Sequence, residues 1–256
     1  TWMDTNYPAG TPRQGYPIEI QALWYYALSF MATTEPSEPT WKNLSQQVQQ
    51  SISRYYPVRN RDSQTFGGDY LADCLHADAF MPASEASRDD HIRPNQLFAI
   101  TLGAIENDHL KSSILTACEE LIIPGAIRSL ADRPVQYHLP VTDQDRLLND
   151  PQHPYLGRYS GDEDHSRKPA YHNGTAWTWP FPSYCEALWM TYGQKARRQA
   201  TDMLASSMKL LNHGCMNQLP EVLDGDYPHR QKGCYAQAWG ITELYRVARL
   251  LKIPGF

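Results

Sequence analysis

An aspartate at the start of the chain stands among residues that suit sugar chemistry. Asp4 follows Trp2 closely and precedes Arg13, in a segment that also contains Pro and Gly. A tryptophan can cover the apolar face of a pyranose, and a carboxyl group can exchange a proton with a glycosidic oxygen. Asp4 is therefore a catalytic candidate. Arg13, and Glu19 in the first turn of the helix predicted next, are candidates for substrate binding.

A second group of acidic residues lies towards the other end of the chain. Glu221, Asp224 and Asp226 crowd a turn that also contains Pro220 and Gly225. Glycoside hydrolysis requires one protonated and one ionised carboxyl group, and repulsion between neighbouring carboxylates raises the pKa of some of them. Glu221 is therefore the second catalytic candidate, and Asp224 is a candidate for substrate binding.

Polar and aromatic residues gather where helices are expected to begin. Such side chains can hydrogen-bond sugar hydroxyls while a Trp covers the ring. The candidates for substrate binding in these two clusters are Arg93, Asn95, Gln96, His172, Thr175 and Trp177. Ordinary structural roles remain open: a helix cap or solvated loop position for Asp4, an acidic turn for Glu221, and a buried structural histidine for His172.

Composition excludes several classes of function. The 256 residues carry a net charge of -5 with acids and bases interspersed, so we expect neither a nucleic-acid partner nor a membrane surface. No apolar run is long enough to cross a bilayer. Five cysteines without a CxxC pair indicate free thiols in a reducing, cytoplasmic setting. The nine histidines lack metal-ligand spacing and no phosphate-binding glycine loop is present, so we expect no metal and no cofactor.

Hydrophobic periodicity predicts an almost entirely helical chain. The helices expected to begin near Pro17, Thr175 and Gly233 are apolar on most sides, whereas those near Thr40 and Gln194 have one apolar face. Residues 128–170 show no helical period and are expected to form a long loop that shapes a site. The predicted helices cover residues 17–33, 40–56, 94–104, 108–121, 175–192, 194–212 and 233–251.

This alternation of buried and half-buried helices is typical of two concentric helical layers. We therefore expect residues 1–256 to be part of a single domain with an α/α-toroid architecture. A closed ring of six helix pairs needs more helices than the chain supplies. We expect an N-terminal part of the same polypeptide, or another chain, to provide them.

Five blocks of sequence, in order along the chain, resemble one family. They are TWMD followed by TPRQGYPIEIQALWY (1–4 and 11–25), RPNQL (93–97), YHNGTAW (171–177), LPEVLDGD (219–226) and GCYAQAW (233–239). The chain resembles the glucosidase part of glycogen debranching enzymes, the amylo-alpha-1,6-glucosidase family.

The resemblance implies an all-α (α/α)6 toroid that hydrolyses the single α-1,6-linked glucose at a glycogen or starch-type branch, with inversion. Asp4 matches the general acid of the family and Glu221 its general base. The last block adds Gln237 and Trp239 as candidates for substrate binding. The substrate would be a glucan or a small glucoside. Two alternatives remain open: a hydrolase of another α-glucoside, such as a trehalose-like disaccharide or a solute glucoside, and a non-catalytic glycan-binding module.

Overall fold

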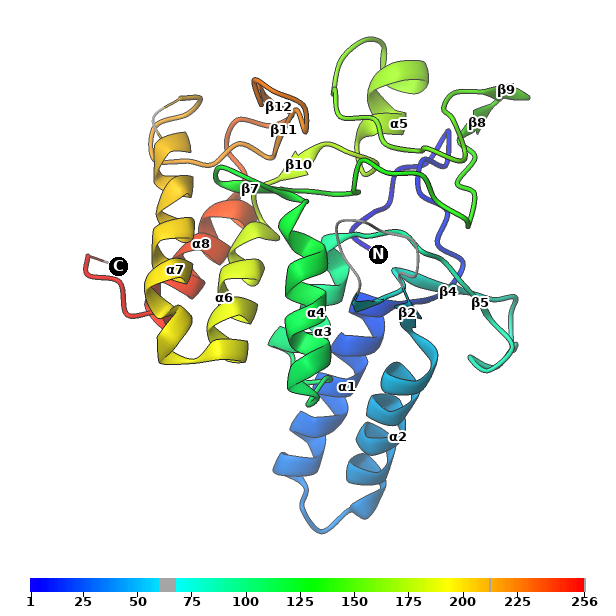
Figure 1. Cartoon of the computed structure of the whole chain (residues 1–256), viewed down its shortest axis with the longest axis vertical. Helices are drawn as coiled ribbons and strands as arrows, with labels where there is room; N and C mark the ends of the chain where they lie inside the picture. The colour runs from blue at the N-terminus through cyan, green and yellow to red at the C-terminus, as the bar shows by residue number, and fades with distance from the viewer. Residues whose placement is uncertain (60–67, 212, 256) are drawn as a thin grey trace.

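The structure is a computed structural model that describes residues 1–59, 68–211 and 213–255. Its first two helices, α1 (Ile18–Thr34) and α2 (Pro39–Tyr55), pack together as a hairpin that projects from the rest of the molecule (Figure 1). The Glu38 side chain accepts a hydrogen bond from the Thr40 amide and caps α2, whose first residue is a proline, where no backbone donor is needed.

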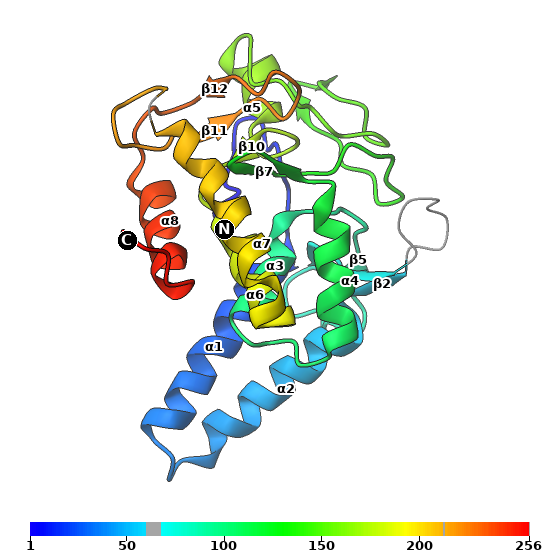
Figure 2. The ribbon, with the colours of Figure 1, turned by 60° about the vertical axis from the view of Figure 1, so that its left-hand side comes forward.

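The central helix is α6 (Phe181–Tyr192), which most other helices contact (Figures 1 and 2). Eight consecutive residues from Phe181 to Leu188 are buried, because apolar side chains occupy most sides of this helix and the buried Glu186 is paired with Arg246. Its neighbours are α3 (Leu97–Thr101), α4 (Asp108–Glu119), α7 (Gln194–Ala205) and α8 (Ala238–Leu250).

Two other helices expected to be buried expose apolar residues instead. On α1, Leu23 is 52% and Phe30 61% exposed, and on α8 Tyr245 is 54% exposed. No element of the described chain covers these faces, so their apolar side chains meet solvent. The expected contrast between inner and outer helices therefore holds for α6 and is wrong for α1 and α8.

The largest sheet has five short antiparallel strands in the order β12-β11-β10-β7-β6, and it lies across one end of the helical layer (Figure 1). Its strands are β6 (Ile122–Ile123), β7 (Ala126–Arg128), β10 (Ala176–Trp177), β11 (Val222–Leu223) and β12 (Gln231–Lys232). A three-stranded sheet joins β1 (Gly15–Pro17), β4 (Cys74–His76) and β5 (Ser87–Arg88). Two hairpins pair β2 (Pro57–Arg59) with β3 (Asp69–Leu71), and β8 (Thr142–Asp143) with β9 (Arg146–Leu147).

The prediction of an all-α (α/α)6 toroid is wrong. Helices make up about 42% and strands about 12% of the described residues, so the fold is mixed α/β. The sequence analysis did not predict the strands because each has only two or three residues. An alternation of period two needs four or more residues to stand out from a helical pattern.

Most of the individual helices were predicted at nearly the right place. Three helices differ from the prediction. Residues 94–104 form a 3-10 turn, η1 (Pro94–Gln96), followed by the short α3. The helix expected from residue 175 begins only at Phe181 because β10 precedes it, and the helix expected from residue 233 begins only at Ala238. Helix α7 is followed by a second 3-10 segment, η3 (Ser206–Leu210), and Asn212, the predicted end, lies outside the described residues.

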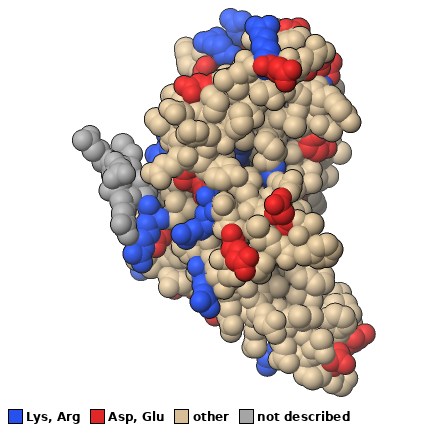
Figure 3. Space-filling view, turned by 90° about the vertical axis from the view of Figure 1, so that its right-hand side faces the viewer, with Lys and Arg blue, Asp and Glu red and all other residues tan. Residues whose placement is uncertain are grey.

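The region 128–170 is mostly irregular, as predicted. It contains the β8–β9 hairpin, a π-helical turn, η2 (Glu163–Arg167), and the single turn α5 (Lys168–Ala170). Of the five free cysteines, Cys74, Cys118 and Cys185 are buried. Within the described ranges, no helix is both long and apolar enough to cross a membrane. On the face shown in Figure 3, basic side chains are interspersed with acidic ones.

The exposed apolar face of α1 should bind a hydrophobic dye. We expect the dye anilinonaphthalene sulfonate to fluoresce with the native chain, because contiguous apolar side chains on a surface offer it a site. Replacing Leu23 and Phe30 together by Gln should remove a large part of this signal. Such exposed substitutions usually change stability by about 0.5 kcal/mol or less. Gln46→Ala, on the exposed side of α2, serves as the control, and full fluorescence of the double variant would contradict the prediction.

Candidate active site

The five-stranded sheet brings together two of the sequence blocks. Trp177 pairs with Val222, and Ala176 with Leu223, so β10 and β11 are adjacent and antiparallel. The turn that precedes β10 holds Tyr171 and His172, and Glu221 comes directly before β11. Tyr171 and Glu221, which are fifty residues apart in the sequence, therefore meet where β10 and β11 begin to pair.

The Glu221 carboxylate accepts hydrogen bonds from three donors. The Tyr171 hydroxyl donates to Oε1, and the Gln237 side-chain amide donates to the same oxygen at 3.2 Å. The Cys234 backbone amide donates to Oε2 at 3.0 Å. Donors on both oxygens fix the orientation of the carboxylate.

Tyr171 lies within the electrostatic reach of both catalytic candidates. Burial raises the pKa of its hydroxyl well above the ordinary value, and so do the hydrogen bond to Glu221 and the charges of Glu221 and Asp4. The Tyr171 hydroxyl is therefore neutral and donates a hydrogen bond to Glu221. Asp4 follows the buried Met3 and is itself exposed to solvent.

Trp2 lies in the middle of an aromatic group, which we call the aromatic recess. It consists of the rings of Trp2, His172, Trp177, Trp179 and Trp239. The centroid of Trp2 lies 5.3 Å from that of His172, and Trp2 meets all four other rings edge-on. Trp239, 38% exposed, stacks on Trp179 at 4.1 Å. The Trp2 indole donates to Asn95 Oδ1 at 2.8 Å, which fixes its ring.

Three buried polar atoms at the aromatic recess lack a hydrogen-bond partner in the described structure: Nε2 of His172, Nε1 of Trp179 and Oε1 of Gln237. Each unmet group costs on the order of 1–3 kcal/mol. The other ring nitrogen of His172, Nδ1, is 2.6 Å from the Thr5 hydroxyl. Burial and the charges of Arg93 and Arg13 lower the pKa of His172 to about 3, so the ring is neutral. The three atoms comprise a donor, Trp179 Nε1, an acceptor, Gln237 Oε1, and a nitrogen of the neutral His172 ring whose role depends on the tautomer.

Behind the aromatic recess lies a buried group of charges, the ion-pair network Arg13, Glu19, Asp73 and Arg93. Arg13 binds Glu19 through two hydrogen bonds of 2.6 and 2.5 Å, and its Nε is 2.7 Å from Asp73 Oδ2. Arg93 Nε is 3.4 Å from the same oxygen. Asn95 donates to Asp73 Oδ1 at 2.7 Å and so connects the network to Trp2.

The remaining predicted residues bind protein groups. Arg93 donates to the carbonyl groups of Ser129 and His172 and to the Asn173 side chain. Gln96 accepts from the Leu71 amide, Thr175 donates to the Tyr171 carbonyl, and Asp224 accepts from the Tyr159 amide. The structure therefore groups Trp2, His172, Trp177, Trp239, Gln237 and Glu221 around one recess. It places Arg13, Glu19, Arg93, Gln96, Thr175 and Asp224 in the supporting framework.

The family model described as amylo-alpha-1,6-glucosidase matches residues 1–246 of the 256 residues. The chain belongs to the amylo-alpha-1,6-glucosidase family. Membership implies a glycoside hydrolase of carbohydrate metabolism whose substrate is a glucan or a glucoside. A comparison with individually curated proteins finds no match.

Three residues of this family member were missed in the sequence. Tyr171 and Trp179 lie next to predicted site residues, but nothing in their spacing separates them from core aromatics. Asp73, which is 1% exposed, follows the buried pair Leu71 and Ala72. A lone acid in an apolar run was the available signal, because such a residue must have a buried partner.

Two loops of the candidate site approach each other through glycines. A Cβ atom on Gly225 would lie 2.0 Å from the carbonyl oxygen of Gly174. Gly174 itself has φ = +147°, and a Cβ there would lie 2.6 Å from the Leu156 carbonyl. The loop that carries Tyr171 and His172 and the loop after Glu221 are thus in direct backbone contact.

The neutral His172 should make the stability of the protein depend on pH. Its pKa in the folded protein is about 3, below the ordinary value of 6.5, so the unfolded state binds the extra proton between these values. The stabilisation is complete above about pH 6.5 and is lost as the pH falls towards 3. We expect His172→Gln to flatten the decline in the free energy of unfolding by at most about 1.4 kcal/mol per pH unit.

Urea unfolding at a series of pH values from 7.5 to 4.5 would measure this decline. Since several acids titrate in the same range, the difference between variant and parent is the informative quantity. His109→Gln, at an exposed position of α4, is the matched control and should keep the parental slope. An identical slope in the His172 variant would contradict the buried neutral ring.

Proposed function

We propose that this chain is an inverting α-glucosidase that hydrolyses α-1,6-linked glucose at the branch points of glycogen or starch-type glucans. Asp4 acts as the general acid and Glu221 as the general base. The observation that carries the proposal is the Glu221 carboxylate, which is oriented by three donors beside an aromatic recess with unmet hydrogen-bonding groups.

The environment of Glu221 suits a base. A carboxylate held in one orientation can take a proton from water as that water attacks the anomeric carbon. Tyr171 and Gln237 both donate to Oε1 and set the angle of the group. The direction of attack is thereby restricted to one side of the sugar, as inversion requires.

The environment of Asp4 suits an acid once substrate is bound. The side chain is exposed in the free protein. A leaving-group sugar that covers Asp4 would bring its glycosidic oxygen next to the carboxyl group. The proton then passes to the glycosidic oxygen as the bond to the anomeric carbon breaks.

The aromatic recess supplies the means of recognising glucose. The indole rings of Trp2 and Trp239 can cover the apolar faces of the sugar. Its hydroxyl groups can satisfy His172 Nε2, Trp179 Nε1 and Gln237 Oε1, the three atoms without partners. Gln237 would then contact the substrate through one atom of its amide and the base through the other.

Replacement of the two carboxyl groups should have different effects. Asp4→Asn should reduce hydrolysis of α-1,6-glucosides by about 1,000-fold, since general acid catalysis typically contributes about 10²–10⁴-fold. α-Glucosyl fluoride, whose leaving group needs little protonation, should be partly spared. Glu221→Gln should abolish turnover of both, because water is no longer activated.

Glucose release from a branched limit dextrin, isomaltose and trehalose would measure activity and distinguish α-1,6 from trehalose-like specificity. Proton NMR of the first product would show β-glucose if the reaction inverts. The two carboxyl groups of inverting enzymes lie about 6.5–9.5 Å apart, against about 5–5.5 Å in retaining ones. Near-normal turnover by Glu221→Gln, or α-glucose as first product, would refute the proposed mechanism.

Tyr171→Phe should lower the rate of catalysis. The variant keeps the ring but loses the hydroxyl that donates to Glu221 Oε1, so the carboxylate is less firmly oriented. We expect kcat to fall about tenfold, as for loss of a hydrogen bond to a charged group. Tyr159→Phe, which keeps a neighbouring stacked ring, is the control. A parental kcat in Tyr171→Phe would contradict the role of this hydrogen bond in orienting the base.

A further inference from the structure

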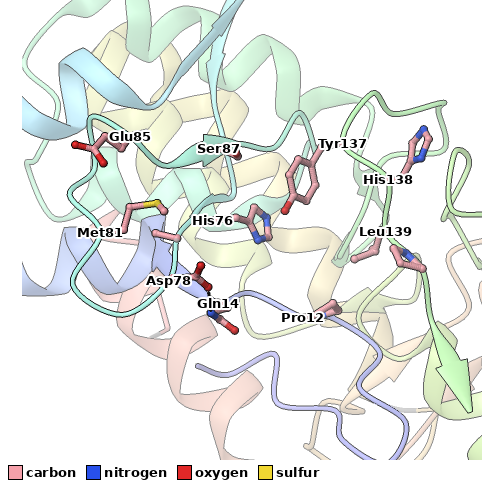
Figure 4. A pocket seen from close by; sticks show the side chains of 12 residues that line it. Pro12, Gln14, His76, Asp78, Met81, Glu85, Ser87, Tyr137, His138 and Leu139 are labelled. Carbon is pink, nitrogen blue, oxygen red and sulfur yellow. Dashed lines mark hydrogen bonds between the residues drawn. The ribbon is translucent and has the colours of Figure 1, made fainter.

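A separate cavity of about 580 Å³ lies beside the loop that connects β4 to β5 (Figure 4). Its lining comes from three segments: the N-terminal segment with Pro12 and Gln14, the loop with Asp78 and Glu85, and the stretch that begins at Tyr137. Ligand pockets typically measure about 300–1,000 Å³. None of the lining residues belongs to the aromatic recess.

One wall of the cavity is a stacked pair of rings. Tyr137 and His76 lie 4.3 Å apart with only 15° between their planes. His76 Nε2 is 3.2 Å from Asp89 Oδ2. Asp89 is fully buried and also accepts the backbone amides of Asp73 and Cys74 at 2.8 and 3.1 Å. The buried Asp89 carboxylate thus fixes the orientation of the His76 imidazole ring.

The backbone of Tyr137 is fixed as well. His91 Nε2 donates to the Tyr137 carbonyl at 2.8 Å, and the Tyr137 amide donates to Asp90 Oδ1 at 2.9 Å. His76 and Tyr137 are both fixed before a ligand binds, so little conformational entropy is lost on binding. The stacked pair is therefore a preformed apolar surface.

The polar groups around this wall restrict the chemistry of the ligand. Asp78 and Glu85 carry negative charge and no lysine or arginine lines the cavity, so phosphates and carboxylates are disfavoured. The Gln14 amide donates to Asp78 Oδ1 at 3.0 Å, and Ser87 adds a hydroxyl. Within the described residues, no three potential metal ligands converge. The hydrogen-bond donors and acceptors distributed around the cavity suit a neutral ligand with many hydroxyl groups.

We propose that this cavity is a second carbohydrate site, which binds a stretch of α-glucan chain away from the bond that is cleaved. A sugar face would lie on Tyr137, and its hydroxyl groups would donate to Asp78 and Glu85. Pro12 and Gln14 belong to the same N-terminal segment as Asp4. This inference rests on the proposed function, because a branched glucan offers a main chain as well as the glucose to be removed.

Binding can be measured without turnover. In a Glu221→Gln background, we expect glycogen in a native gel to retard the protein and maltoheptaose to bind in calorimetry. Tyr137→Ala should weaken maltoheptaose binding about tenfold through loss of ring stacking. Asp78→Ala, an exposed substitution that does not disturb the wall, should weaken it about fivefold. Tyr26→Ala on α1 and Asp202→Ala on α7 are the matched controls and should bind as the parent does.

Parental affinity in both Tyr137→Ala and Asp78→Ala would overturn the proposal. Binding of the cation spermidine that Asp78→Ala abolishes, with unchanged maltoheptaose binding, would overturn it too and identify a cation site. Failure of the unaltered chain to hydrolyse any α-glucoside would count against the proposed function alone. The gel and the calorimeter report binding whether or not the bond is cleaved.

Discussion

The buried ion-pair network is the interaction on which the rest of the site depends. Arg13 and Asp73 connect the N-terminal segment to the turn between β3 and β4, while Glu19 and Arg93 add the first turn of α1 and the start of η1. Two positive and two negative groups balance inside the protein. Loss of one would leave an uncompensated buried charge, which typically costs about 3–5 kcal/mol. Through Asn95 the network also fixes Trp2, and with it the centre of the aromatic recess.

The sequence predicted correctly those features that depend on the residues of a single element. Helix α1 begins directly after Pro17, and the side chains of Glu38 and Asn107 cap α2 and α4, so the limits of these helices could be predicted within a few residues. The sheets depend on pairing between distant short segments, which no local pattern records. The all-α prediction failed for that reason, and the burial of α1 and α8 failed because it depends on neighbouring elements.

The same distinction applies to the site. Motifs identified four of the five rings of the aromatic recess, all but Trp179, yet half of the predicted binding residues support the framework instead. The sequence alone does not distinguish a buried Arg or Gln that binds a sugar from one that binds a backbone carbonyl group. Arg93 illustrates this, because its donors are directed at Ser129, His172 and Asn173. Tyr171 could be recognised only after β10 and β11 were seen to pair, since its partner Glu221 lies fifty residues away.

The contact between Gly174 and Gly225 limits how such a protein can evolve. A Cβ atom on Gly225 would meet the Gly174 backbone, and a Cβ atom on Gly174 would meet the backbone of Leu156, so neither position can accept a side chain without a shift of the backbone. Insertions or bulky replacements here would separate Tyr171 from Glu221. New specificities must therefore arise by exchange of side chains around a constant backbone, and the outer loops are the places where length can vary.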